Sequence, residues 1–221
     1  MKRFNYFKLI FTLFALAFSL SNFGQEKPMN SQFKSPQEAA NQGKADLLTV
    51  LKSGRDLNIG VTAEQLEKAS AGKEITRRTL KFEKILNLEN TKSLRETESE
   101  LVNTVVPLML DGKVITVIDV KQTNEGWVVS GLGGMSLSND LSTVLAASKN
   151  ADVIIYDVPN LQSIIYTVVV NGEEVYYSTL SEKQSLRTAT TREVMFPILQ
   201  AEARAFQEEW GDKLKEGKLV R

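Results

Sequence analysis

The sequence predicts an α+β protein in which antiparallel sheet(s), built from tight hairpins, carry helices packed on one face. Three observations lead to this class. Two Asx-Gly pairs lie between runs of β-branched residues, helical periodicity is confined to other segments, and strands come in runs instead of alternating singly with helices. A long C-terminal helix is expected to complete the fold.

Two helices are expected before the first strand, and each opens with a capping box. Residues 35–38 (SPQE) place serine at the N-cap, proline at the first helical position and glutamate where its side chain can reach back. An apolar stripe carries this helix to a stop at residues 53–54. Residues 62–65 (TAEQ) open a second, shorter helix that is expected to end at Gly72.

The middle of the chain changes to the alternation typical of strands. A strand is expected over 75–86. Asp111-Gly112 and Asn171-Gly172 then indicate two hairpins, because both central residues of a type I′ turn need positive φ. The expected hairpins join 105–110 to 113–120 and 164–170 to 173–180.

A two-residue turn also predicts which residues face each other across a hairpin. The expected pairs are Leu108 with Ile115, Val106 with Val117, Val168 with Val175, and Tyr166 with Tyr177.

The remaining elements follow from shorter patterns. Strands are expected over 127–130 and 153–156, with a helix opened by Ser138 between them. The last helix is expected to start at Phe196 or Pro197, because proline fits a first turn better than a helix interior.

Residues 35–221 are expected to form a single domain after a flexible polar linker at 25–34. The order of elements in 62–134 loosely matches that in 135–221, and the two hairpin turns lie 60 residues apart. A tandem duplicated α-β-β-β unit would explain this match. The alternative is that two hairpins coincide in spacing.

Residues 1–24 have the layout of a secretory signal peptide. A basic segment precedes residues 9–20 (LIFTLFALAFSL), and small polar residues end at Gly24. This run of 12 residues is shorter than the roughly 20 that a membrane-spanning helix needs. We therefore expect cleavage near Gly24 and a periplasmic or secreted protein of a Gram-negative-like bacterium, not stably inserted in a membrane; a retained anchor is the alternative.

Composition excludes several classes of function. Residues 1–24 contain three of the 27 basic residues and none of the 27 acidic ones, so the remaining chain has a net charge of −3, which does not favour nucleic-acid binding. The whole sequence lacks cysteine and histidine. These absences exclude disulfides, histidine-ligated zinc and serine-histidine or cysteine-histidine nucleophile pairs.

Four motifs could carry chemistry, but each has a simpler structural explanation. The glycines at 131, 133 and 134 lack the third glycine of a dinucleotide loop, and the acidic run at 96–100 (ETESE) lacks a calcium-loop pattern. Ser70 and Lys73 have Ser-x-x-Lys spacing without its companion motifs. Glu208 and Asp212 share a helix face, as paired carboxylates of a hydrolase would. We expect no cofactor, no metal and no assigned catalytic residue.

A candidate partner-binding surface lies on the second hairpin. Tyr176 is expected beside Thr167 and Glu174, on the sheet face opposite Tyr166. An aromatic residue on a mixed polar face suits contact with a partner. A helix that covers this face is the alternative explanation.

The order of a helix followed by an antiparallel sheet is loosely similar to cystatin-like and related small exported binding folds. No motif specific to those families is present, so no residue role is transferred. We expect an exported, non-enzymatic binding protein whose ligand is a protein, a peptide or an envelope component, bound in part by strand addition at a sheet edge. A carboxylate-dependent hydrolase, using Glu208 and Asp212 or Glu96–Glu100, is the alternative, and the oligomeric state stays open.

Overall fold

The computed structural model describes residues 32–55, 57, 59–149, 151–180 and 188–215. The predicted signal peptide and most of the predicted linker lie outside them. The helices are α2 (Pro36–Lys52), α3 (Ala63–Lys68), α4 (Phe82–Ile85), α5 (Met135–Ala147) and α6 (Arg192–Lys215), with 3-10 turns η1 (Leu88–Asn90), η2 (Leu94–Glu96) and η3 (Pro159–Leu161). The strands are β1 (Ser70–Ala71), β2 (Ile75–Leu80), β3 (Ser99–Leu110), β4 (Lys113–Thr123), β5 (Gly126–Leu132), β6 (Val153–Val158), β7 (Ser163–Val170) and β8 (Glu173–Ser178).

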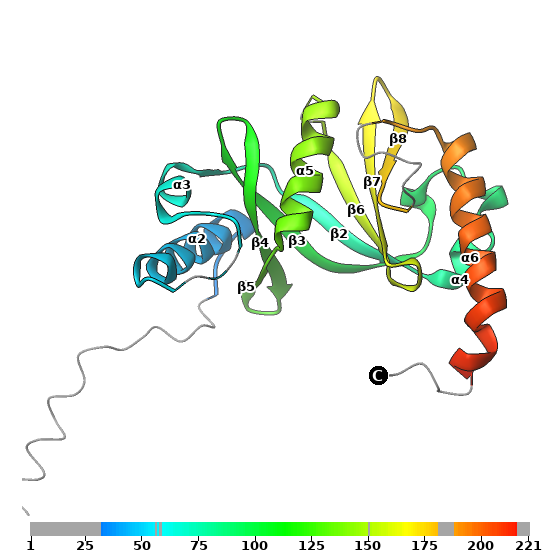
Figure 1. Cartoon of the computed structure of the whole chain (residues 1–221), viewed down its shortest axis with the longest axis horizontal. Coiled ribbons are helices and arrows are strands. Elements are labelled where there is room, and N and C mark those ends of the chain that lie inside the picture. Colours follow the sequence, from blue (N-terminus) through cyan, green and yellow to red (C-terminus); the bar gives the residue numbers. More distant parts are fainter. Residues whose placement is uncertain (1–31, 56, 58, 150, 181–187, 216–221) are drawn as a thin grey trace, which may run out of the picture. The chain divides into compact units, whose positions relative to one another are not determined.

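The eight strands of the described residues belong to one sheet, which confirms the predicted α+β class (Figure 1). Their order is β5-β4-β3-β2-β6-β7-β8, with β1 paired to β3. The central strands β2 and β6 run parallel, whereas every other neighbouring pair is antiparallel. Each central strand therefore starts a run of antiparallel strands toward its own edge. This is the order that two similar halves would produce, although the duplication itself stays a prediction.

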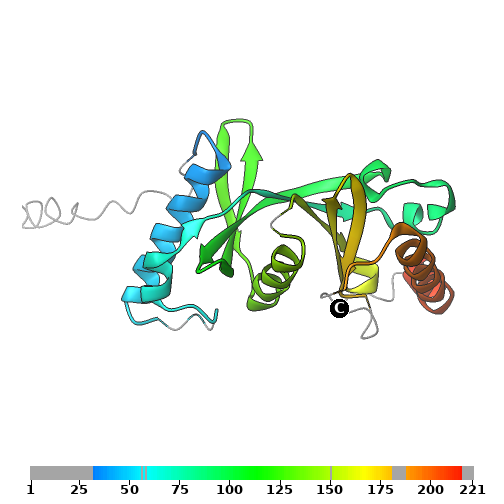
Figure 2. The same ribbon diagram turned by 90° about the horizontal axis from the view of Figure 1, so that it is seen from above.

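Helices cover both faces of the sheet instead of the single face that we expected. Successive strand residues point to opposite faces. Val105 packs in a core with α5, whereas its neighbour Val106 packs in a core with α2. Ile155 and Tyr156 divide in the same way between α5 and α6. Consequently α5 lies on one face, with α2 and α6 on the other. Figure 2 shows α2 and α6 toward opposite ends of the sheet, with α5 between them. The sequence does not encode the choice of face locally.

Both predicted hairpin turns are present. Asp111 and Gly112 have φ of 50° and 74°, and Asn171 and Gly172 have φ of 54° and 85°, as the turn type requires. The predicted register of the second hairpin is confirmed, with Val168 opposite Val175 and Tyr166 opposite Tyr177.

The predicted register of the first hairpin is wrong by one residue. Pairing starts as expected at Met109 with Val114, and then shifts, so that Leu108 faces Thr116 and Val106 faces Ile118. The cause is a bulge between Leu108 and Met109, which puts an extra residue into one strand.

Several predicted boundaries also move. The helix expected from Ser138 begins at Met135, and the helix expected from Phe196 or Pro197 begins at Arg192, with Pro197 inside it. Burial of Met195 and Phe196 stabilises this extra turn despite the proline. The strand expected over 75–86 ends at Leu80, since the next residues form α4. The short helix ends at Lys68 instead of Gly72, and residues 70–71 pair with β3.

Helices α2 and α3 begin at the capping residues that the sequence predicts. Ser35 accepts from the Glu38 N–H, and Thr62 and Gln65 form the complete reciprocal box. Glu38 does reach back, but to the N–H of Lys34, at 3.0 Å, one residue earlier than the standard box.

Both outer edges of the sheet are partly covered by short backbone bridges. On β5, Phe33 and Trp127 exchange two N–H···O bonds of 2.8 Å. On β8, Thr190 and Tyr176 exchange two bonds of 2.9 Å. Each bridge occupies backbone groups that would otherwise be available to another strand.

A close approach between the β5–α5 turn and the sheet generates the first testable prediction. A Cβ on Gly133 would lie 1.9 Å from the Cγ2 of the buried Val117. We expect Gly133→Ala to lower the free energy of unfolding by about 1–3 kcal/mol through overpacking, measured by urea denaturation. Gly131→Ala is the matched control, because its nearest contact would be Asp119 Oδ2 at an ordinary 3.6 Å. Equal stability of the two variants would contradict the close packing.

Candidate functional site

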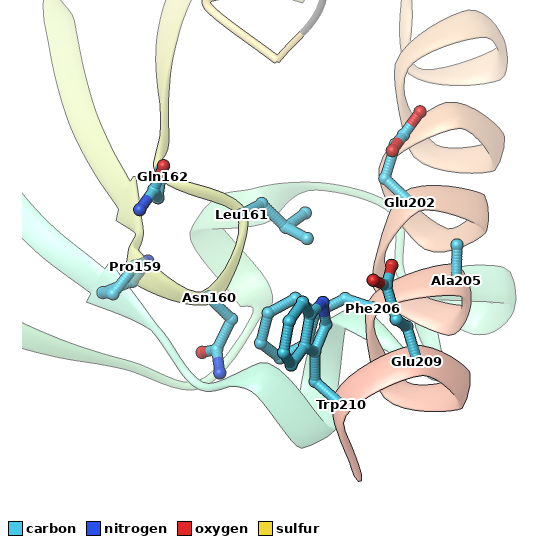
Figure 3. Close-up of a pocket in the computed structure, with 9 residues that line it drawn as sticks. All are labelled: Pro159, Asn160, Leu161, Gln162, Glu202, Ala205, Phe206, Glu209 and Trp210. Atoms are coloured by element: carbon cyan, nitrogen blue, oxygen red, sulfur yellow. The ribbon is translucent and has the colours of Figure 1, made fainter. Parts of the chain in front are cut away.

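A groove of about 630 Å³ lies between η3 and α6. We call it the η3–α6 groove (Figure 3). Its lining consists of Pro159, Asn160, Leu161, Gln162, Glu202, Ala205, Phe206, Glu209 and Trp210. Phe206 and Trp210 point from the helix toward the η3 loop and Asn160, with Glu209 close to them, whereas Glu202 lies farther along the helix.

Packing on the sheet holds the two walls of this groove. Leu199 and Ala203 of α6 are fully buried, and Gln200 donates to the carbonyl of Leu86 at 2.8 Å. Phe206 packs edge-to-face against Phe82 of α4, with ring centroids 5.5 Å apart. The opposite wall is a tight turn that Gln162 ends in the left-handed conformation, at φ 47°. Neither wall is a loose chain segment.

The electrostatic character of the groove is acidic. Glu202 and Glu209 lie seven residues apart on α6, so they share one side of the helix about 10 Å apart. Both side chains are exposed, and within the described part of the chain neither has an ion-pair partner. Among the residues whose side chains the structure describes, no lysine or arginine lines the groove. The lining therefore offers one carboxylate, Glu209, beside the aromatic pair and a second, Glu202, farther along the helix.

A second concentration of polar groups lies within the sheet. We call Arg77, Asn103, Asp119 and Asp157 the Arg77 cluster, and its members come from β2, β3, β4 and β6. Arg77 donates to both carboxylate oxygens of Asp157, at 2.7 and 3.0 Å. Hydrogen bonding to Asp157 raises the pKa of Arg77. This bidentate pair joins the two parallel central strands.

The partly buried carboxyl of Asp119 has fewer partners to balance its charge than that of Asp157. Burial raises the pKa of Asp119, although attraction to Arg77 and a hydrogen bond from Asn103 oppose that shift. One side-chain oxygen of Asp119 and one of Asn103 are buried without a hydrogen-bond partner among the described residues. Buried acceptors without a hydrogen bond are uncommon and destabilising, so a donor that reached these two oxygens would stabilise the site.

A tyrosine-carboxyl pair flanks this cluster. The buried Tyr166 donates its hydroxyl to Asp140 of α5 at 3.1 Å. Burial raises the pKa of both groups, so the tyrosine stays protonated and ties α5 to β7.

The residues of the predicted partner-binding surface lie together as expected, since Thr167 faces Tyr176 and Val169 faces Glu174. Tyr176 and Thr167 are fully buried, however, and the ring of Tyr176 packs against Phe196 of α6. Glu174 accepts from the Tyr176 hydroxyl and pairs with Arg95 at 3.0 Å. A covering helix therefore accounts for this tyrosine.

The other predicted motifs are placed apart from both sites. Glu98 binds Lys81 and Lys84, which lower its pKa, and the described residues contain no group of three acidic side chains that could hold a metal. Lys73 pairs with Asp152 instead of Ser70. Glu208 is exposed outside the η3–α6 groove, and the side chain of Asp212 lies outside the described residues.

Sequence reasoning missed the Arg77 cluster, although a signal was present. Asp119 and Asp157 each interrupt an apolar strand (VITVIDV and VIIYDV). Asp119 follows the buried Val117 by two residues, so it shares its inward-facing side. A charge at such a position indicates a buried partner. The groove had no comparable signal, because its walls are 40 residues apart.

No family model matches the sequence, and neither a curated protein nor a solved structure matches the chain. In the described residues, no helix is both long and apolar enough to cross a membrane.

The burial of Asp119 predicts a pH-dependent stability. Its raised pKa means that the protonated carboxyl stabilises the fold below the ordinary aspartate pKa, and that this contribution is lost as the pH rises through the raised value. We therefore expect Asp119→Asn to be more stable than the parent at pH 7, and the advantage to disappear below about pH 4. Urea denaturation across this pH range measures it.

Asp152→Asn is the control, because that exposed carboxylate pairs with Lys73 and should show no advantage at pH 7. Lower stability of Asp119→Asn at pH 7 would show that attraction to Arg77 outweighs the cost of burial.

Proposed function

We propose that this chain is an exported, non-enzymatic binding protein that holds a cationic group of a protein or peptide partner in the η3–α6 groove. Export is proposed from the signal-peptide pattern of residues 1–24. The observation that carries the binding function is that Phe206 and Trp210 line the same groove as two carboxylates that lack ion-pair partners in the described chain.

The chemistry of the groove favours a cation over other ligands. Lysine and arginine head groups bind to aromatic faces through the ring quadrupole, and carboxylates attract them further. An anionic ligand would meet Glu202 and Glu209, with no compensating cation among the described lining residues. Asn160 and Gln162 add amide groups that can orient the bound group.

The alternative, a carboxylate-dependent hydrolase, has weaker support. Glu208 does not line the groove, and Glu98 of the second candidate group is engaged by two lysines. Glu202 and Glu209 do line it together with an aromatic pair, so a glycosidase and peptidase screen of the purified protein and its Glu→Gln variants is the appropriate test. Activity lost in one of these variants would replace binding with catalysis as the proposed function.

The binding proposal predicts that acetylated trilysine amide binds in the groove, as measured by isothermal titration calorimetry. Glu202→Gln and Glu209→Gln should each weaken binding about two- to fivefold, as expected for exposed ion pairs. Trp210→Ala should weaken it about tenfold through loss of the aromatic face. Raising the salt concentration should weaken binding to the parent protein, because exposed charges are screened.

Glu208→Gln is the matched control, since it removes an exposed carboxylate from the same helix outside the groove. It should change affinity less than twofold. An unchanged affinity in the double variant of Glu202 and Glu209 would contradict the proposal, as would preferential binding of the neutral sugar chitotetraose.

A further inference from the structure

The first five residues of β3 are not paired to β4. The two strands pair from the turn as far as Thr104 opposite Val120. Beyond that point, β3 stays paired to β2 at residues 99–101 and 103, with a bulge that leaves Val102 without a β2 partner. Residues 121–123 of β4 stay paired to β5. We call this divergence the fork. Figure 2 shows the β4–β5 hairpin turning away from the line of β3.

The β3 side of the fork is a strand edge within the sheet. Among the described residues, 99–103 have a strand on the β2 side only. Arg78 holds the beginning of this edge in place, because it donates to the hydroxyl and the carbonyl of Ser99 at 2.7 and 3.0 Å. An ordered edge with one open side is the template on which an extended segment adds as a new strand.

Apolar side chains are exposed along the same edge. Leu101 is 59% exposed and the adjacent Val102 is 40% exposed. The edge also carries one exposed charge, Glu100, of the kind that discourages pairing with a neutral or acidic strand. Leu101 and Val102 give an added strand apolar surface to bury.

Unsatisfied acceptors lie where the fork begins. Asn103 is the last residue of the open edge, and Asp119 is adjacent to Val120, the last residue of β4 paired to β3. Each of the two side chains has a buried oxygen without a partner in the described chain. Both oxygens are hydrogen-bond acceptors. The negative charge of Asp119 is only partly balanced, because Arg77 donates its hydrogen bonds to Asp157. The complementary group is a cationic donor.

We propose that the fork takes up an extended segment of a partner protein by strand addition along residues 99–103, with a lysine or arginine of that segment at Asn103 and Asp119. The edge supplies backbone hydrogen bonds, Leu101 and Val102 supply apolar contact, and the two acceptors select the cation. This site shares no residue with the η3–α6 groove, so it stands independently of the function proposed for that groove.

The test uses four fluorescent peptides, Thr-Val-Thr-X-Thr-Val-Thr, in which X is lysine, arginine, glutamate or norleucine. Fluorescence anisotropy with the purified chain should show lysine or arginine peptides binding at least about tenfold more tightly than the other two, as expected for a hydrogen-bonded charge. Hydrogen exchange should slow at amides within 99–103. Of two lysine peptides N-methylated at odd or at even positions, at least one should lose binding, because alternate N–H groups face β3.

Two variants and one control locate the site. Leu101→Lys should weaken the lysine peptide about tenfold, since it removes apolar contact and adds repulsion. Asp119→Asn should also weaken it about tenfold while the protein stays folded. Val169→Lys is the matched control, because Val169 is an exposed strand residue on β7, away from the fork, and binding should not change.

Four results would overturn the proposal: no binding by any peptide up to about 1 mM, equal affinity for all four, protection confined to β5 or β8, or binding that survives both N-methylated forms. Two others would assign a different occupant. Tighter peptide binding after deletion of residues 1–31 would identify this chain's own segment, and a dimer dissociated by Leu101→Lys would identify a second copy.

Discussion

The parallel pairing of β2 with β6 is the constraint on which the rest of the structure depends. It joins two runs of antiparallel strands into one sheet, and without it each run would expose an apolar edge and lose part of its core. The bidentate contact of Arg77 with Asp157 reinforces this seam from two adjacent strands. Because Arg77 donates its hydrogen bonds to Asp157, the charge of Asp119 is only partly balanced. The negative charge at the fork is therefore a consequence of how β2 and β6 are joined.

The two proposed sites differ in what holds them. The η3–α6 groove is formed by side chains on a helix and a tight turn, both anchored in the core beneath α6. The fork is formed by backbone, and arises because β4 follows β5 and its bulge instead of continuing along β3. Side-chain recognition and strand addition are distinct binding modes, which allows them to act on different parts of one partner.

Local chemistry made much of the fold predictable. Turn residues located both hairpins, capping residues located the first two helices, and the two-residue turn assigned the second hairpin its register. The register of the first hairpin was not predictable from its turn, because a two-residue turn does not reveal the bulge at Leu108 and Met109 farther along the strands. The early start of α6 was missed for a similar reason, since burial of Met195 and Phe196 overrides the preference of Pro197. Neither candidate site was foreseen, because each combines elements far apart in the chain.

The bridges on the outer edges set how many extended segments the sheet can accommodate. Phe33 and Thr190 each obstruct one outer strand, so lateral growth by successive copies is hindered at both ends. A segment added along residues 99–103 would instead enter between β3 and the β4–β5 hairpin, at a position within the strand order. Its uptake would leave the obstruction of both outer strands in place, so the complex would gain no new end on which further copies could stack.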